Sequence, residues 1–163
     1  MAKLVALDTE DGDMFGSSVA VRGTTIVVGA SKDVTATEND TGSAYVFERD
    51  VDGFWIEMAK LLGSNAGSND EVGTAASICG ERIVVSSPYD DDAGTNGGSA
   101  YLYERDADGL WIQLEVEELY PFGVDNHPRF GLSASCDGAT IAVGGPYYNG
   151  VGYNSGVVFV FQR

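Results

Sequence analysis

The chain has 163 residues, 44 % of them hydrophobic, which is enough for one folded domain with a full core and excludes a disordered segment. Its formal net charge of −16, from 25 Asp and Glu against 9 Lys and Arg, opposes contact with nucleic-acid phosphates or with the anionic face of a membrane, so neither is expected as a partner. The 22 glycines against only 4 prolines favour many short strands joined by tight turns, so we expect an all-β fold.

In chain order, the first expected element is a short strand, KLVAL at 3–7, which has no neighbouring strand of its own. Residues 1–4 repeat the pattern of residues 58–61, so the chain opens in the middle of an outermost strand. Short apolar stretches bounded by Gly, Asp and Asn clusters then predict four strands, at 15–21, 24–30, 42–49 and 53–61.

The same unit recurs twice along the chain. Its second copy predicts strands at 72–78, 81–87, 97–105 and 109–116, and its third copy predicts strands at 130–136, 139–145 and 156–163. Trp55 and Trp111 lie 56 positions apart, while Gly16, Gly73 and Gly131 follow one another at steps of 57 and 58. This period is slightly above the lengths typical of β-propeller blades and still favours radial stacking, with a solenoid as the weaker alternative.

Each strand of the unit has its own composition. The first is built from small residues, which fit the crowded axis of a propeller, and the second is apolar on both faces, as in a strand between two neighbouring sheets. The third carries aromatic residues at period two, and the mixed polarity of the fourth marks it as outermost. We therefore predict three four-stranded antiparallel blades of a β-propeller, at 8–65, 66–121 and 122–163. The third lacks its own outer strand, and strand 3–7 of the same or a partner chain would complete it.

A recurring motif joins the first and second strands of each unit. Phe15-Gly16 precedes Gly29-Ala30, Val72-Gly73 precedes Ser86-Ser87-Pro88, and Phe130-Gly131 precedes Gly144-Gly145-Pro146. This pattern resembles the FG-GAP repeat of integrin-type propellers, although Ser31 replaces the proline in the first copy and Val72 replaces the phenylalanine in the second. The resemblance implies a propeller of about seven blades, an extracellular or surface setting, and a role in adhesion, recognition or scaffolding.

The two ends of the chain complement each other. Natural propellers use about four to eight blades, so three blades do not easily close a ring. Two copies would make six, with strand 3–7 of one chain completing the third blade of the other. The alternative is that the remaining blades belong to a longer chain.

Two features bear on the setting of the protein. Cys79 and Cys136 are too few for a disulfide scaffold, and each lies in an apolar strand pattern, which favours two buried thiols and leaves open whether they are free. No run approaches the ~18 apolar residues that would span a bilayer, so we expect no membrane insertion.

The loops between second and third strands, at 31–42, 87–98 and 146–156, are the candidates for metal binding. The corresponding loop of integrin-type repeats can hold calcium, and calcium prefers six to eight oxygen ligands. None of the three has the D-x-D-x-D-G spacing of a calcium loop, and Asp, Asn and Gly are also good turn formers. The candidate ligands are Asp90, Asp91, Asp92 and Asn96.

The third loop is the candidate for ligand binding, because exposed aromatic residues beside asparagine can stack on sugars or on partner side chains. Its residues are Tyr147, Tyr148, Asn149 and Tyr153. With a single histidine, His127, and no nucleophile motif, a catalytic triad is not expected. The leading hypothesis is a non-enzymatic binding or scaffold module whose partner is a protein or a glycan.

Two alternatives stay open at this point. The first is a glycoside-active enzyme, in which Asp90 and Asp92 converge with Glu38 or Asp40 of a neighbouring blade for acid/base catalysis. The second is a fragment of a longer surface protein whose function resides in other blades.

Overall fold

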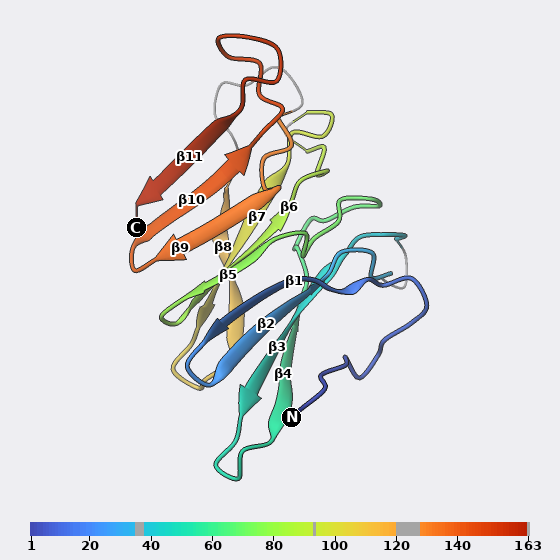
Figure 1. The fold of residues 1–163 in the computed structure, drawn as a ribbon, viewed down its shortest axis with the longest axis vertical. Coiled ribbons are helices and arrows are strands. Elements are labelled where there is room, and N and C mark those ends of the chain that lie inside the picture. Colours follow the sequence, from blue (N-terminus) through green and yellow to red (C-terminus); the bar gives the residue numbers. More distant parts are fainter. Residues whose placement is uncertain (35–37, 93, 120–127, 163) are drawn as a thin grey trace.

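The computed structural model describes residues 1–34, 38–92, 94–119 and 128–162. The described residues form eleven strands in three antiparallel sheets, which we call blades 1, 2 and 3 (Figure 1). Blade 1 contains β1 (Phe15–Arg22), β2 (Thr25–Ala30), β3 (Ser43–Arg49) and β4 (Trp55–Leu61). Blade 2 contains β5 (Ala76–Cys79), β6 (Arg82–Ser87), β7 (Ser99–Arg105) and β8 (Trp111–Leu119), and blade 3 contains β9 (Ser133–Asp137), β10 (Thr140–Gly145) and β11 (Val157–Gln162).

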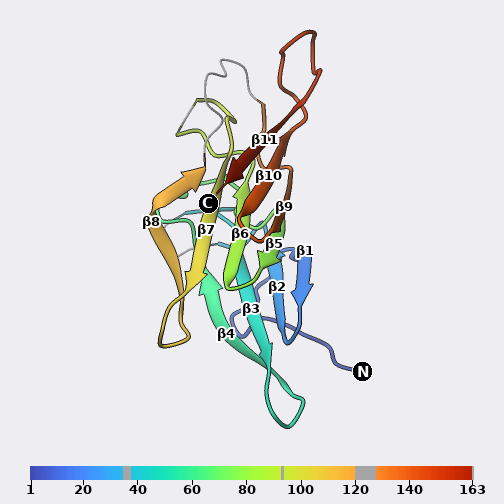
Figure 2. The ribbon, with the colours of Figure 1, turned by 90° about the vertical axis from the view of Figure 1, so that its left-hand side faces the viewer.

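Within each blade the strands lie side by side in chain order, as expected for propeller blades. Figure 2 shows the first strands β1, β5 and β9 on one side of the stack and the outermost strands β4 and β8 on the other. The sheets do not close into a ring. The predicted all-β fold of three blades, with three strands in the last, is therefore confirmed. In the described ranges, no helix is long and apolar enough to cross a bilayer.

Three strands differ from the prediction by three or four residues at one end. β5 and β9 begin at Ala76 and Ser133, four and three residues late. At the predicted starts, the amides of Val72 and Phe130 donate to carbonyls of the preceding blade instead. β8 continues to Leu119 instead of about Val116, because β7 and β8 shift register between Tyr101 and Tyr103. The extra residues of this bulge bring Leu119 opposite Ala100, the place that Leu61 takes opposite Ala44 in blade 1.

The blades pack face to face, with the aromatic face of one blade on the aliphatic face of the blade before it. Tyr101 and Tyr103 of blade 2 are buried in one cluster with Val27 and Val46 of blade 1. Phe159 and Phe161 of blade 3 pack in the same way on the second cluster, around Val84 and Leu102 of blade 2. Because every blade repeats the same faces, the structure is a stack of equivalent interfaces.

The N-terminal segment occupies the face that no preceding blade covers. Leu4 and Ala6 pack on Tyr45 and Phe47 of blade 1, and the Leu7 amide donates to the Glu57 carboxylate at 2.9 Å. Residues 3–7 form no strand and pair with no strand of blade 3. In the single chain this segment lies on blade 1, and the completion of blade 3 by such a strand stays a prediction.

A disulfide bond joins blades 2 and 3. Cys79 ends β5 and Cys136 lies in β9, and their Cα atoms are 5.7 Å apart. The expectation of two buried thiols is therefore wrong. Sequence reasoning placed each cysteine in its own strand, whereas the stacking of neighbouring first strands brings the two residues together.

Candidate functional site

Antiparallel pairing places the three long loops at one end of the blades. The loops between β2 and β3, β6 and β7, and β10 and β11 lie at that end, and the tight turns between first and second strands lie at the other (Figure 1). We call the first group the loop end. All the predicted calcium and ligand residues belong to it.

The predicted calcium residues are only partly brought together. Asp90 is 1 % exposed, and its carboxylate accepts hydrogen bonds from Ser99 Oγ at 2.6 Å, the Tyr101 hydroxyl at 3.2 Å and the Asp92 amide at 2.9 Å. Asp91 is exposed, and the carbonyl of Asn96 accepts the Arg129 amide at 3.2 Å. Among the described residues, no three His, Cys, Asp or Glu side chains gather as a metal site would require. These bonds give Asp90 a structural role in the turn.

In blade 1, a lysine neutralises Asp33, the residue at the repeat position of Asp90. Lys60 Nζ lies 2.7 Å from Asp33 and 2.7 Å from Asp8, and the Tyr45 hydroxyl donates to Asp8 at 2.8 Å. Burial opposes charge on Lys60, but its hydrogen bonds to Asp33 and Asp8 outweigh burial and raise its pKa above the ordinary value. The cluster ties the N-terminal segment to blade 1.

Blade 2 has no lysine in the matching place. Tyr45 pairs with Lys60 across β3 and β4, whereas Tyr101 pairs with Glu118 across β7 and β8. The pKa of Asp70 is raised to about 6, first by burial and then by the charges of the three aspartates at 90–92. The second loop therefore lacks the compensating lysine that blade 1 has at the matching position.

The four predicted ligand residues do not act as one group. Tyr153 is 88 % exposed, whereas Asn149 Oδ1 accepts the Asn154 amide at 2.7 Å and so shapes the loop. Tyr148 is half-buried, and a Cβ on Gly150 would come within 2.7 Å of its ring, so the two pack together. The ring of Tyr147 lies against the guanidinium of Arg129.

Sequence reasoning missed Arg129, which lies between two aromatic rings of the loop end. Its guanidinium carbon is 5.1 Å from the centroid of Tyr89 and 4.6 Å from that of Tyr147. Such contacts contribute roughly 0.5–1 kcal/mol at partly exposed sites. The sequence feature that could have indicated this contact is the Pro-Tyr pair after the second strand in the last two units, at 88–89 and 146–147, because it puts an equivalent aromatic ring in both loops.

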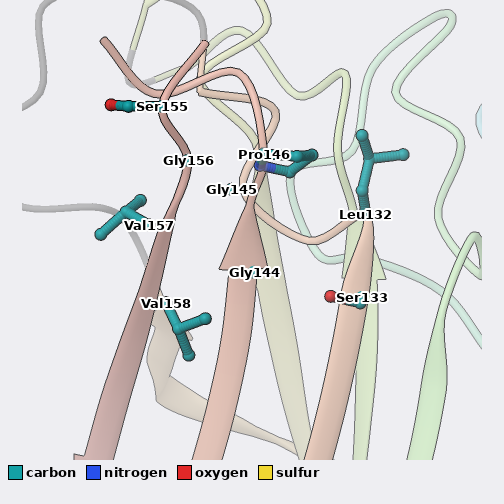
Figure 3. A pocket seen from close by; sticks show the side chains of 9 residues that line it. All are labelled: Leu132, Ser133, Gly144, Gly145, Pro146, Ser155, Gly156, Val157 and Val158. Carbon is teal, nitrogen blue, oxygen red and sulfur yellow. The ribbon is translucent and has the colours of Figure 1, made fainter. Parts of the chain in front are cut away.

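The carboxylates considered for glycoside hydrolysis do not converge. Asp40 pairs with Lys32 at 3.0 Å, Glu38 accepts a hydrogen bond from Ser68, and Asp90 is buried. A pocket of about 610 Å³ lies at the free face of blade 3 (Figure 3), and a smaller one of about 390 Å³ lies beside Trp55. None of these carboxylates lines either pocket.

The Val-Gly and Phe-Gly pairs that begin the second and third units are the joints between blades. Val72 donates its amide to the Thr41 carbonyl of blade 1 at 2.8 Å, and Gly73 accepts from Ser17 Oγ and Ser18 Oγ at 3.2 and 2.8 Å. Phe130 repeats this contact, donating to the Gly97 carbonyl of blade 2 at 3.1 Å. The motif therefore has a structural role between blades.

A sequence model of the FG-GAP repeat matches residues 1–47 and 55–103, more than half of the chain. The chain belongs to the FG-GAP repeat family. The match does not extend to the third unit, whose likeness to the other two repeats rests on its strands, its Phe-Gly joint and its packing. None of the curated proteins compared with this FG-GAP chain matches it.

Proposed function

We propose that this FG-GAP protein is a non-enzymatic binding or scaffold module that presents its loop end to a protein or a glycan outside the cell. The observation that carries the proposal is the collection of three loops at one end of the stack of blades (Figure 1), with Tyr153 of the third loop 88 % exposed. Rigid sheets with variable loops at one end are a common arrangement for recognition.

The extracellular setting is supported by the disulfide bond between Cys79 and Cys136. Disulfide bonds persist in oxidising compartments and are rare in the reducing cytosol of mesophiles. The surplus of acidic residues also favours protein or carbohydrate partners over nucleic acids.

Replacing Tyr153 by alanine should abolish binding to the glycan or purified surface protein that the chain selects, because this ring is the most exposed aromatic group of the loop end. The measurement is binding of labelled protein to a glycan array and to a panel of purified extracellular proteins. Phe54→Ala is the matched control, since Phe54 is 67 % exposed but lies in the turn between β3 and β4 at the other end. Binding that Phe54→Ala abolishes and Tyr153→Ala leaves intact would contradict the proposal.

We further propose that calcium stabilises the second loop. The support is the contrast between blades: Lys60 compensates Asp33 in blade 1, whereas in blade 2 the aspartates at 90–92 raise the pKa of Asp70. A divalent cation would supply the missing positive charge and accept carboxylate oxygens as ligands.

Calcium should raise the melting temperature at neutral pH and release heat in a calorimetric titration, and both effects should shrink at pH 5 as protons compete for the carboxylates. The double variant Asp91→Asn, Asp92→Asn should lose both effects. Asp11→Asn, Asp52→Asn removes the same charge from exposed positions elsewhere and should keep them. A melting temperature unaffected by calcium in the unmodified protein would rule this role out.

A further inference from the structure

The pocket at the free face of blade 3 is an empty copy of the joint that links the blades (Figure 3). Its lining includes Ser133, Gly144 and Gly156. In the repeat these positions correspond to Ser18, Gly29 and Gly42 of blade 1, which enclose the joint to blade 2. We call this pocket the socket.

The two filled joints show what the socket is built to hold. A Cβ added to Gly29 would overlap the Gly73 carbonyl oxygen, and one added to Gly42 would overlap the backbone of Val72. At the second joint, a Cβ on Gly98 would overlap the Phe130 carbonyl oxygen. At Gly156, by contrast, the nearest atoms to such a Cβ belong to Pro146 of its own blade, at 3.5 Å and beyond. The socket therefore matches the backbone of a hydrophobic residue followed by glycine.

The N-terminal end of the chain carries such a segment without a socket. In all three units, the residue before the hydrophobic-Gly pair has a positive φ: 56° at Met14, 58° at Glu71 and 45° at Arg129. Gly16 has a φ of 99°, close to the values of the other two joint glycines. The Phe15 ring lies 5.7 and 6.1 Å from the rings of Tyr45 and Phe47, as Phe130 lies 5.5 and 6.0 Å from those of Phe159 and Phe161. A Cβ on Gly16 would meet nothing within 4 Å. Met14-Phe15-Gly16, which we call the plug, is thus preformed and unoccupied.

We propose that the socket of one chain binds the plug of a second copy, so that two chains close head to tail into a ring of six blades. An interface between different surfaces generates a ring or an open filament. Six blades lie within the range of about four to eight found in propellers that close at ordinary twist. In such a ring, each of the two sockets would hold the plug of the other copy.

The side chains at the proposed interface are compatible. Val158 and Val160 of blade 3 are 64 % and 62 % exposed, yet the equivalent Ala100 and Leu102 of blade 2 are fully buried by blade 3. On the plug side, Val19 and Val21 of β1 are exposed to a similar degree, 63 % and 66 %. Docking would bury these valines together, as blades 1 and 2 already bury their counterparts.

A pair of residues beside each joint supports the same fit. Lys32 contacts Glu71 at 2.6 Å across the first joint, and Tyr89 lies over Arg129 across the second. At the proposed third joint the corresponding pair is Tyr147 and Met14 of the second copy, which are both exposed. A thioether beside an aromatic ring is a favourable contact and leaves no charge unpaired.

The missing outer strand of blade 3 would come from the second copy as well. Leu61 lies opposite Ala44 in blade 1, and Leu4 and Val158 are their equivalents. Residues 1–4 of the second copy would therefore pair with β11, which is an edge strand of its sheet among the described residues. Because each chain carries a net charge of −16, association should strengthen as salt screens the repulsion.

Cross-linking tests the geometry directly. Asp137 and Val21 stand at the repeat positions of Cys79 and Cys136, so Asp137→Cys with Val21→Cys should form a disulfide between copies, seen as a covalent dimer on a non-reducing gel. Arg22→Cys with Ile78→Cys places the same pair inside one chain and should lose two free thiols while the protein still runs as a monomer on the gel. A ladder of trimers and larger species would overturn the closed ring. No dimer, with the internal control formed, would overturn the interface.

Sedimentation equilibrium at micromolar concentration gives a second readout. The unmodified chain should sediment at twice its monomer mass, more completely at high salt. Val158→Glu and Val19→Glu, one on each side of the interface, should each weaken association by more than about tenfold, because a buried carboxylate loses its hydration. Val51→Glu is the control, since Val51 is fully exposed in the turn between β3 and β4 and should change nothing. A strict monomer that none of these variants alters would overturn the dimer and leave the socket to a blade of a longer chain.

Discussion

Replacing Gly73 by alanine should lower the free energy of unfolding by about 3–5 kcal/mol. Two causes add at this position. Gly73 has a φ of 95°, which costs an alanine about 1–3 kcal/mol, and the new Cβ would overlap the Ser43 carbonyl oxygen of blade 1. The joint between blades 1 and 2 would have to open to relieve the overlap, so its backbone hydrogen bonds would be lost. Urea denaturation followed by tryptophan fluorescence measures the change.

Gly16→Ala separates the two causes. Gly16 has nearly the same φ, 99°, but open space where the Cβ would stand. At concentrations low enough to keep the chain monomeric, it should lose only the conformational part, about 1–3 kcal/mol. Equal losses in the two variants would show that close approach at the joint contributes nothing.

Removing the disulfide bond should destabilise the protein by about 4 kcal/mol, as expected for a cross-link that closes a loop of this length. Cys79 and Cys136 are 57 positions apart and clamp blade 3 to blade 2, so the unfolded chain gains freedom when the bond is absent. The double variant Cys79→Ser, Cys136→Ser isolates this effect in thermal or urea unfolding.

A reductant provides the matching control for that variant. It should destabilise the unmodified protein by a similar amount and leave the double serine variant unchanged. Two titratable thiols in the unreduced, denatured protein would show that the bond does not form.

The positions of the strands could be predicted because they depend on local composition. Small residues, β-branched runs and aromatic alternation recur at one period, and glycines with positive φ, such as Gly23 and Gly80, end the first strand of each unit. The predicted and observed second and third strands agree to within one or two residues. Local pattern and backbone geometry point to the same fold here.

The candidate site was less predictable, because its residues come from different blades. Arg129 lies between Tyr89 and Tyr147 only after blades 2 and 3 have stacked. The sequence predicts that the aspartates at 90–92 bind a metal ion together, yet the carboxylate of Asp90 accepts hydrogen bonds from Ser99 and Tyr101. Side-chain direction in a loop depends on neighbours that lie far away in the chain.

The sequence by itself determined that this protein contains FG-GAP repeats, that its unit recurs three times, and where the strands of each unit lie. Only the tertiary structure decided that Cys79 bonds to Cys136, that Leu4 and Ala6 pack on blade 1, and that the Phe-Gly motif is a joint between blades. The physical reason is that strand identity follows from a few adjacent residues, whereas these contacts join residues one whole repeat apart.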